Sequence, residues 1–239
     1  MTLGHLSLAD VALIAIRLVI VIASIVAHEL CHGLAAYRLG DRTAKDAGRL
    51  TLNPLRHLDP FGSVLLPALM AFTGGPIFAY AKPVPYNPAN FRNRRRDELL
   101  VALAGPAANL VLGVVGVLVM WVAYLVGAGD PVRLHDVRYW VYWFGYSVAL
   151  INFVLFFFNI IPIPPLDGSS VIAALIPQRY MPVFYRVKSY SMLILIVIVF
   201  ALPMVLNMDP IGVYFSVTSD RLLDALSPHL TYYVGGTGL

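Results

Sequence analysis

The chain has 239 residues, of which 59% are hydrophobic and only 13% charged, and its mean hydropathy is +0.76. This composition is typical of an integral membrane protein. The net charge of +4 does not indicate a nucleic-acid partner, because the basic residues occur in short runs beside apolar segments, where they anchor a protein to anionic lipid headgroups. We therefore expect a lipid bilayer around the chain and no nucleic acid. Cys31 is the only cysteine, which excludes an intrachain disulfide.

The first predicted element is a membrane-spanning helix over residues 11–39, and it contains His28, Glu29 and His32. Each ionisable group at membrane depth costs at least ~2.5 kcal/mol, so a group of them on adjacent turns indicates a function. Residues four apart share one face of a helix, so His28 and His32 can bind one zinc ion while Glu29 stands beside it as a base. This is the H-E-x-x-H arrangement of metalloproteases, placed inside a bilayer. In the alternative interpretation, both histidines hydrogen-bond to a neighbouring helix and burial neutralises the glutamate.

The next apolar block, residues 61–78, is short and interrupted by proline and glycine, which is typical of a broken or re-entrant element. Residues 49–52 before it alternate polar with apolar side chains, and prolines force residues 82–86 after it to be extended. We predict a small membrane-associated β-hairpin whose edge accepts an extended substrate strand. The substrate-binding residues would be Leu50, Thr51 and Leu52. The alternative is a plain interfacial loop.

Three later apolar blocks, residues 99–127, 139–161 and 190–206, are predicted to cross the membrane, and residues 211–226 to lie in the interface or pack on the bundle. The predicted fold class is an all-α multipass membrane bundle of about four to six membrane segments, with the small hairpin or re-entrant element added. We expect one domain over residues 1–239, with its core at about 8–206 and an interfacial or packing segment at 207–239.

The basic residues predict the orientation of this bundle. Most of them fall in residues 40–60, 79–98 and 177–189, whereas residues 128–138 contain only Arg133 and Arg138. Because basic loops stay in the cytoplasm, the first three segments are expected inside and the fourth outside. The predicted location is therefore the cell membrane of a prokaryote, crossed several times.

A zinc protease needs a third protein ligand and leaves one position for water. Asp167 follows a proline-rich stretch at the end of a predicted span, where the backbone cannot remain helical. Irregular backbone at this depth is tolerated only where protein or a wet cavity covers it, so a metal site can be built there. The alternative makes Asp167 the N-cap of a short helix. Glu98, the second of the two glutamates in the sequence, lies in a charged interface segment, which is a poor place for a metal ligand at membrane depth.

Two further residues are not expected to bind metal. Cys31 lies three residues from His28 and can in principle reach a metal, but a small thiol packed against a neighbouring helix is the favoured interpretation. His57 lies in a loop beside Asp59 and Pro60 and is expected to make local hydrogen bonds.

Together these motifs resemble the site-2 protease family of intramembrane zinc metalloproteases. The resemblance rests on His28 to His32, on Asn159 and on the Pro-Pro-Leu-Asp-Gly run that ends at Gly168, and it extends through residues 48–54, 57–60, 81–85 and 104–109. It covers about residues 8–206 and is to the compact prokaryotic members without PDZ or CBS domains. It implies that His28, His32 and Asp167 hold zinc and that Glu29 is the catalytic base. Asn159 resembles the family's asparagine and is a candidate oxyanion donor or substrate-positioning residue, or alternatively ties together the end of its helix.

The sequence thus predicts an intramembrane endopeptidase with one Zn²⁺ per chain. It would cleave membrane-embedded protein substrates, in regulated intramembrane proteolysis, with zinc-activated water and Glu29 as general base. One alternative is a membrane zinc protease of the prenyl-protein processing kind, which would need Glu98 as third ligand. The other is a non-proteolytic membrane protein that binds or transports metal, which has no need of a general base. Neither the substrate nor the oligomeric state is indicated.

Overall fold

The computed structural model describes residues 8–59, 82–126, 137–201, 203, 205 and 209–228. Within these residues every regular element is helical, which confirms the predicted all-α class. Three helices are long and apolar enough to cross a membrane: α1 (Leu8–Arg38), α4 (Arg94–Val126) and α5 (Val137–Ile160). A fourth candidate span is a bent pair of segments, Gln178–Ser189 and Leu193–Val199, which meet at 60°.

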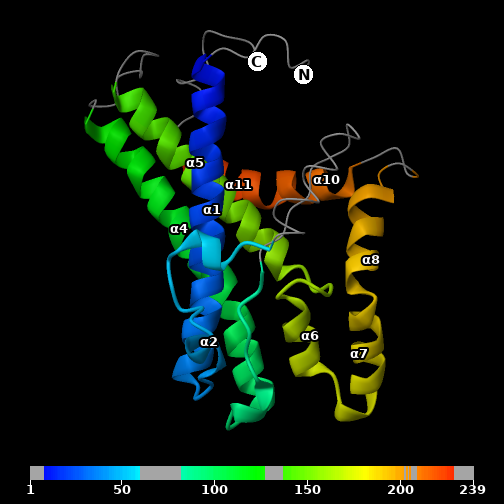
Figure 1. Cartoon of the computed structure of the whole chain (residues 1–239). Helices are drawn as coiled ribbons and strands as arrows, with labels where there is room; N and C mark the ends of the chain where they lie inside the picture. Colours follow the sequence, from blue (N-terminus) through cyan, green and yellow to red (C-terminus); the bar gives the residue numbers. More distant parts are fainter. Residues whose placement is uncertain are drawn as a thin grey trace.

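The shorter elements connect and cover these long helices. They are α2 (Thr43–Asp46), α6 (Ser169–Leu175), α7 (Met181–Ser189), α8 (Ser191–Ile196), α10 (Pro210–Val217) and α11 (Ser219–Leu226), with the 3-10 turns η2 (Pro54–Arg56), η4 (Pro88–Asn90) and η5 (Gln178–Tyr180) and the π-helical η6 (Val197–Ala201). Figure 1 shows α1, α4 and α5 side by side, α7 and α8 standing apart from them, and α10 and α11 running across the long helices.

The predicted β-hairpin is not seen in the described part of the chain. Residues 49–52 and 82–86 have no strand assignment, and residues 60–81, which include the predicted re-entrant element, lie outside the described residues. The two flanking segments nevertheless lie beside each other. Arg49 Nη2 donates to the Lys82 carbonyl at 2.7 Å, and the Lys82 amide donates to the His57 carbonyl at 2.9 Å.

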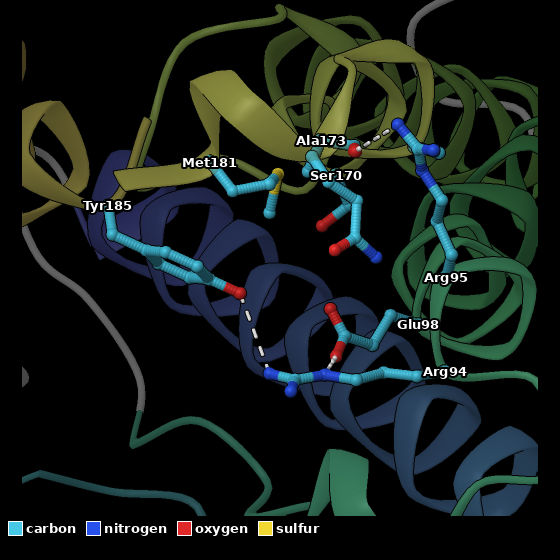
Figure 2. Close-up of a pocket in the computed structure, with 9 residues that line it drawn as sticks. Arg94, Arg95, Glu98, Ser170, Ala173, Met181 and Tyr185 are labelled. Carbon is cyan, nitrogen blue, oxygen red and sulfur yellow. Dashed lines mark hydrogen bonds and ion pairs between the residues drawn. The ribbon is translucent and has the colours of Figure 1, made fainter. Parts of the chain in front are cut away.

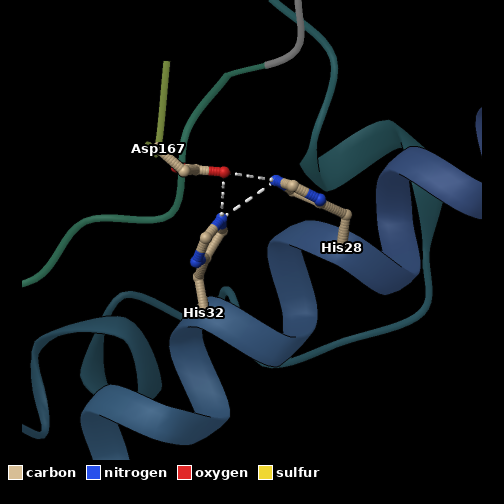
Figure 3. Close-up of side chains that lie close together, drawn as sticks. All are labelled: His28, His32 and Asp167. Carbon is tan, nitrogen blue, oxygen red and sulfur yellow. Dashed lines mark hydrogen bonds and ion pairs between the residues drawn. The ribbon is translucent and has the colours of Figure 1, made fainter. Parts of the chain in front are cut away.

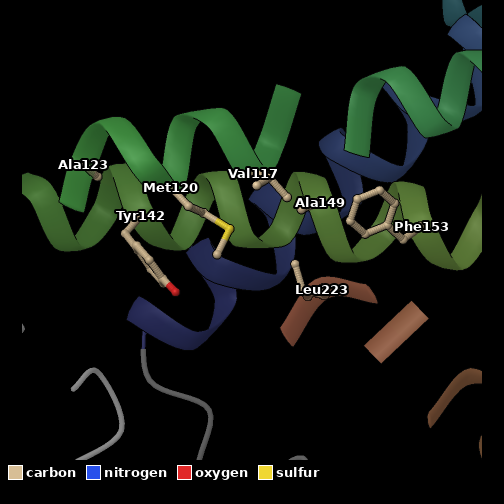
Figure 4. Close-up of a cluster of buried hydrophobic side chains, with 7 residues drawn as sticks. All are labelled: Val117, Met120, Ala123, Tyr142, Ala149, Phe153 and Leu223. Atoms are coloured by element: carbon tan, nitrogen blue, oxygen red, sulfur yellow. The ribbon is translucent and has the colours of Figure 1, made fainter. Parts of the chain in front are cut away.

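The core of the bundle is the contact between α4 and α5. Its buried cluster consists of Val117, Met120, Ala123, Tyr142, Ala149, Phe153 and, from α11, Leu223 (Figure 4). Small residues let the two helices approach closely, as is usual in membrane bundles. A Cβ added to Gly116 would lie 2.5 Å from the Ala149 amide nitrogen and 2.6 Å from the Gly145 carbonyl oxygen. The outer face of α4 is apolar and exposed, with Val122 and Leu125 at 57% and 65%, which fits a lipid environment.

A buried carboxylate fixes the chain that follows residue 81 onto the end of α1. Asp41 is fully buried and accepts hydrogen bonds from Thr43, from the Asn87 amide at 2.7 Å and from Asn90 Nδ2 at 2.6 Å. Burial alone would raise the pKa of Asp41, but these hydrogen bonds outweigh it and lower the pKa below its ordinary value. The carboxylate is therefore charged and holds residues 87–90 in place.

The close contact at Gly116 yields a stability prediction. Gly116→Ala should destabilise the protein by about 1–3 kcal/mol, because the added methyl group meets backbone atoms of α5 that cannot move independently. The matched control is Leu118→Ala on the same helix, whose side chain is 58% exposed and should matter little. Thermal unfolding in detergent micelles measures both variants, and equal losses would contradict the close packing of α4 on α5.

Candidate metal centre

Three predicted ligands lie together in the structure. His28 and His32 project from one face of α1, and Asp167 faces them from the loop between α5 and α6 (Figure 3). The Asp167 Oδ2 atom lies 3.1 Å from His28 Nε2 and 3.3 Å from His32 Nε2, and the two Nε2 atoms are 2.9 Å apart. Within the described residues this is the one group of three such side chains whose ligand atoms converge.

The hydrogen bonds on the far side of each ring determine which nitrogen carries the proton. His32 Nδ1 lies 2.7 Å from the Val101 carbonyl oxygen, which can only accept, so Nδ1 must be the donor. His28 Nδ1 lies 2.5 Å from Asn109 Oδ1 and is assigned as a donor in the same way. Each neutral ring then presents an unprotonated Nε2 to the other and to the carboxylate. The lone pairs face one another without a hydrogen between them, an arrangement that a bound cation stabilises.

The Asp167 carboxylate is available to bind a metal ion. Its Oδ2 atom is buried and has no geometrically sound hydrogen bond within the described chain. Two imidazole nitrogens and one carboxylate oxygen are the donor set of a catalytic zinc site, which keeps a fourth position open. The residues present therefore fit Zn²⁺.

A chain of buried amides supports His28 from behind. Asn109 Nδ2 donates to Asn152 Oδ1 at 2.9 Å, and Asn152 Nδ2 donates to Ser24 Oγ at 2.9 Å. The three residues come from α4, α5 and α1, and each is at most 3% exposed. This network joins the three long helices at the depth of the site. Such outer partners fix the tautomer and the orientation of a metal-binding histidine.

The register of α4 against α1 makes this possible. Val101, Gly105 and Asn109 are four residues apart and share one face of α4. The Val101 carbonyl accepts a hydrogen bond from His32, and the Asn109 side chain accepts one from His28. Gly105 lies between them, and a Cβ there would be 2.6 Å from His28 Nε2 and closer still to His32 Nε2. In the sequence, Gly105 and Asn109 stood out only as part of the 104–109 motif, and neither was predicted to contact the metal ligands. Their spacing, matched to that of the histidines, was the signal for this role.

The loop that carries Asp167 is held by its main chain. The Gly168 amide donates to the Asn159 carbonyl at 2.7 Å, and a Cβ at Gly168 would collide with the Ile160 carbonyl oxygen. The N-cap of α6 is Gly168, with no side-chain capping hydrogen bond, so Asp167 does not cap this helix. Its carboxylate is turned toward the histidines instead.

Glu29 shares a cavity with the ligand group. Glu29, His32 and Asp167 line a space of about 240 Å³ together with Pro83, Val84, Tyr86, Val101, Ala102, Pro165, Leu166, Ser169, Ser170 and Lys188. We call this space the catalytic cavity. The Val84 amide donates to Glu29 Oε2 at 2.8 Å, so the extended segment 82–86 orients this carboxylate.

The remaining predicted site residues lie elsewhere. Asn159 Nδ2 donates to the Leu155 carbonyl of its own helix at 3.0 Å, which is the contact of a residue that ties together a helix end. Leu50 packs near Gly33 of α1, Thr51 gives its carbonyl to His57, and Leu52 is 71% exposed. The described residues that line the catalytic cavity include residues 83, 84 and 86 but not residues 50–52.

Other ionisable residues are used outside the ligand group. His57 is buried and its Nε2 bonds to the Thr51 carbonyl at 2.9 Å, in line with a local structural role. Glu98 pairs with Arg94 at 2.8 Å, and Cys31 is a free thiol. Among described residues, none of these joins the converging ligand atoms.

Comparison with known proteins identifies a matching family model and several similar proteins. A sequence model described as Peptidase family M50 matches residues 129–202, the part of the chain that includes Asp167. YwhC of Bacillus subtilis, provisionally named a zinc metalloprotease, is 37% identical over 179 residues, which are 74% of this chain and 76% of YwhC. Rip2 of Mycolicibacterium smegmatis, with the same provisional name, is 30% identical over 73% of this chain and 62% of its own. Zinc metalloprotease MJ0392 of Methanocaldococcus jannaschii is 24% identical over 70% of this chain and 36% of its own. No solved structure matches the chain significantly.

The amide network leads to a prediction about metal affinity. Asn109→Ala should weaken zinc binding about 10- to 100-fold, because His28 loses the acceptor that fixes its ring. Asn159→Ala is the matched control, since its side-chain amide bonds only to its own helix among the described contacts, and it should bind zinc as tightly as the wild type. Competition with a chelator of known affinity measures both. Equal zinc affinity of Asn109→Ala and wild type would show that the network does not support the site.

Proposed function

The chain belongs to peptidase family M50, the site-2 proteases, and we propose that it is an intramembrane endopeptidase that cleaves membrane-embedded segments of other proteins. Family membership makes it a zinc-dependent metallopeptidase. The observation that carries the finer proposal is the convergence of His28, His32 and Asp167 beside Glu29, on and between helices long enough to span a bilayer.

In this proposal His28, His32 and Asp167 hold the metal and Glu29 is the general base. When bound, zinc would act as a Lewis acid that lowers the pKa of a coordinated water and polarises the peptide carbonyl of the substrate. Val84 keeps Glu29 Oε2 occupied, which leaves Oε1 to take the proton from the attacking water and return it to the leaving amine. The role proposed for Asn159, contact with the substrate or its oxyanion, requires its amide to leave the Leu155 carbonyl when substrate binds.

Two competing functions fit less well. A prenyl-protein type protease would use a glutamate as third ligand, but Glu98 is engaged with Arg94 and Asp167 occupies the ligand position. A site that only transports metal needs no carboxylate beside the ligands, yet the Val84 amide holds Glu29 in the cavity.

The proposed substrate must lose its helical structure to react. A carbonyl in a helix is inaccessible to attack, so the substrate segment must unwind locally. The backbone N–H and C=O groups that unwinding frees then need hydrogen-bond partners in a site with little water. Segment 82–86 is extended and borders the catalytic cavity, so we propose that the substrate lies along it as a strand. Arg49 donates to the Lys82 carbonyl, and His57 bonds to the Thr51 carbonyl. These contacts hold residues 50–52 near segment 82–86, and these residues would extend the same surface.

The bilayer setting and orientation complete the proposal. Residues 1–239 would form a single protease domain in the cell membrane, with its core at about residues 8–206. The Arg94 end of α4 would lie in the cytoplasm, because basic residues gather at that end.

Substitution of the base and of a ligand should separate their roles. Glu29→Gln should keep zinc near stoichiometric and abolish cleavage, because the amide cannot accept a proton. Asp167→Ala should lose zinc as His28→Ala does, since two ligands hold it poorly. Metal analysis and cleavage of a single-span substrate are measured on each variant, with Glu98→Gln as a control that keeps its zinc. Loss of zinc from Glu29→Gln would make Glu29 a ligand and refute the assignment.

Strand addition makes a separate prediction about the substrate. A substrate with glycine near the cleavage site should be cut faster than a rigidly helical one, because unwinding costs it less. Leu52→Pro should cut cleavage severely with unchanged zinc content, whereas Leu52→Ala, which removes the side chain but keeps the amide donor, should not. If Leu52→Pro cleaves as fast as Leu52→Ala and the helical substrate is cut as fast as the flexible one, the substrate does not bind as a strand.

A further inference from the structure

A second cavity opens beside the catalytic one, at the arginine-rich end of α4. It has a volume of about 270 Å³ and is lined by Arg94, Arg95, Glu98, Ser170, Ala173, Ala174, Gln178, Met181 and Tyr185 (Figure 2). We call it the arginine cavity. Its walls come from the first turns of α4, from α6 and from the η5 and α7 segment, so it lies where the α6 to α7 corner meets the bundle.

The arginine cavity is a neighbour of the catalytic cavity. Ser170 lines both of them, and its amide donates to the Asp167 carbonyl at 2.9 Å. Tyr86 lines the catalytic cavity, and its pKa is raised by burial and by the carboxylates of Glu98 and Asp167, one from each cavity. The two cavities therefore adjoin at Ser170, and we refer to the line from one to the other past this residue as the path.

Two guanidinium groups define the chemistry of this space. Arg94 Nε pairs with Glu98 at 2.8 Å and Arg94 Nη2 reaches the Tyr185 hydroxyl at 3.5 Å, while the Arg94 side chain is 64% exposed. Arg95 donates to the carbonyls of Ala173 and Ile176 at the end of α6. Arginine carries five N–H donors, so Arg94 keeps donors for a carboxylate after making these contacts.

The charge balance at the arginine-cavity end of the path is positive, with Arg94 and Arg95 against Glu98. Lys188 lines the catalytic cavity from the last turn of α7 and forms no ion pair with any described residue, and Arg94 and Arg95 follow in the arginine cavity. Glu98 is the one carboxylate among these groups. Glu29 and Asp167 also border the path, but their two negative charges match the charge of one Zn²⁺.

We propose that the arginine cavity is a substrate subsite that selects an acidic side chain on the flank of the substrate that leaves the catalytic cavity past Ser170. This proposal rests on the proteolytic function above and adds a substrate class to it. We favour a peptide side chain over an anionic lipid headgroup because the arginine cavity adjoins the catalytic cavity at Ser170, so one polypeptide can occupy both. Because cytoplasmic flanks of membrane spans are usually basic, an acidic residue there distinguishes a substrate from most other membrane proteins.

The test uses the full-length zinc-loaded protein in bilayers of zwitterionic lipid. Three single-span substrates carry Asp, Asn or Lys at one position, moved stepwise along the flank beyond the cleavage site. We expect one position at which Asp is cleaved with kcat/KM about five-fold above Lys, mainly through KM, with Asn between them. Salt should reduce this ratio.

Two opposite variants make the assignment specific. Arg94→Gln should abolish or reverse the preference for Asp, because Glu98 is then unpaired, and Glu98→Gln should increase it. Arg96→Gln is the matched control, since Arg96 follows on the same turn and does not line the cavity, and it should keep the wild-type ratio.

The outcomes distinguish this inference from the proposed function. Cleavage of all substrates without any effect of charge would overturn the subsite and leave the protease intact, whereas no cleavage of any substrate would contradict the protease itself. A second series contains anionic phosphatidylglycerol. If Arg94→Gln changes cleavage only with this lipid, and equally for all substrates, the cavity holds a lipid headgroup and the proposal is wrong.

Discussion

Three lone pairs that meet without a hydrogen between them are the constraint on which the rest of the structure depends. The Nε2 atoms of His28 and His32 and the Oδ2 atom of Asp167 lie within 3.3 Å of one another. With both rings neutral, these three atoms present lone pairs to one another, an arrangement that rings held from behind make possible and that a bound cation would stabilise. The need to hold the rings from behind explains why α4 presents a carbonyl, a glycine and an amide to α1 at intervals of four residues.

Polar groups at membrane depth are tolerable here because each has a partner. The Asn109, Asn152 and Ser24 side chains bond to one another and to His28, so the interior of the three-helix bundle holds a complete polar network in place of isolated polar groups. The same network couples the metal-binding ring to all three long helices. Gly116 of α4 and Gly145 of α5, each about two helical turns from these amides, let the two backbones approach closely.

The local parts of the site could be predicted from sequence, and the parts made by distant contacts could not. The relation of His28, Glu29 and His32 follows from helical geometry alone, and Asp167 was found because prolines end a helix beside it. The role of Asn109 was not predicted, because it depends on the register of α4 against α1, which no local pattern encodes. For the same reason, the substrate-binding residues were expected at 50–52, whereas residues 83, 84 and 86 border the catalytic cavity in the described chain.

Irregular chain helps to position both the base and the third ligand: Glu29 projects from α1 but its carboxylate contacts segment 82–86, and Asp167 lies in the loop before α6. Glu29 is oriented by the Val84 amide, and that segment is fixed a few residues later by the buried carboxylate of Asp41. Asp167 precedes α6, whose last carbonyls accept hydrogen bonds from Arg95 at the start of α4. The long helices therefore place both histidines and the base, while charged contacts at the helix ends hold the two irregular segments that orient the Glu29 carboxylate and carry Asp167. A substitution at Asp41 or Arg95 can therefore alter the rate of cleavage without removing a metal ligand, because these residues hold the segments that orient Glu29 and carry Asp167.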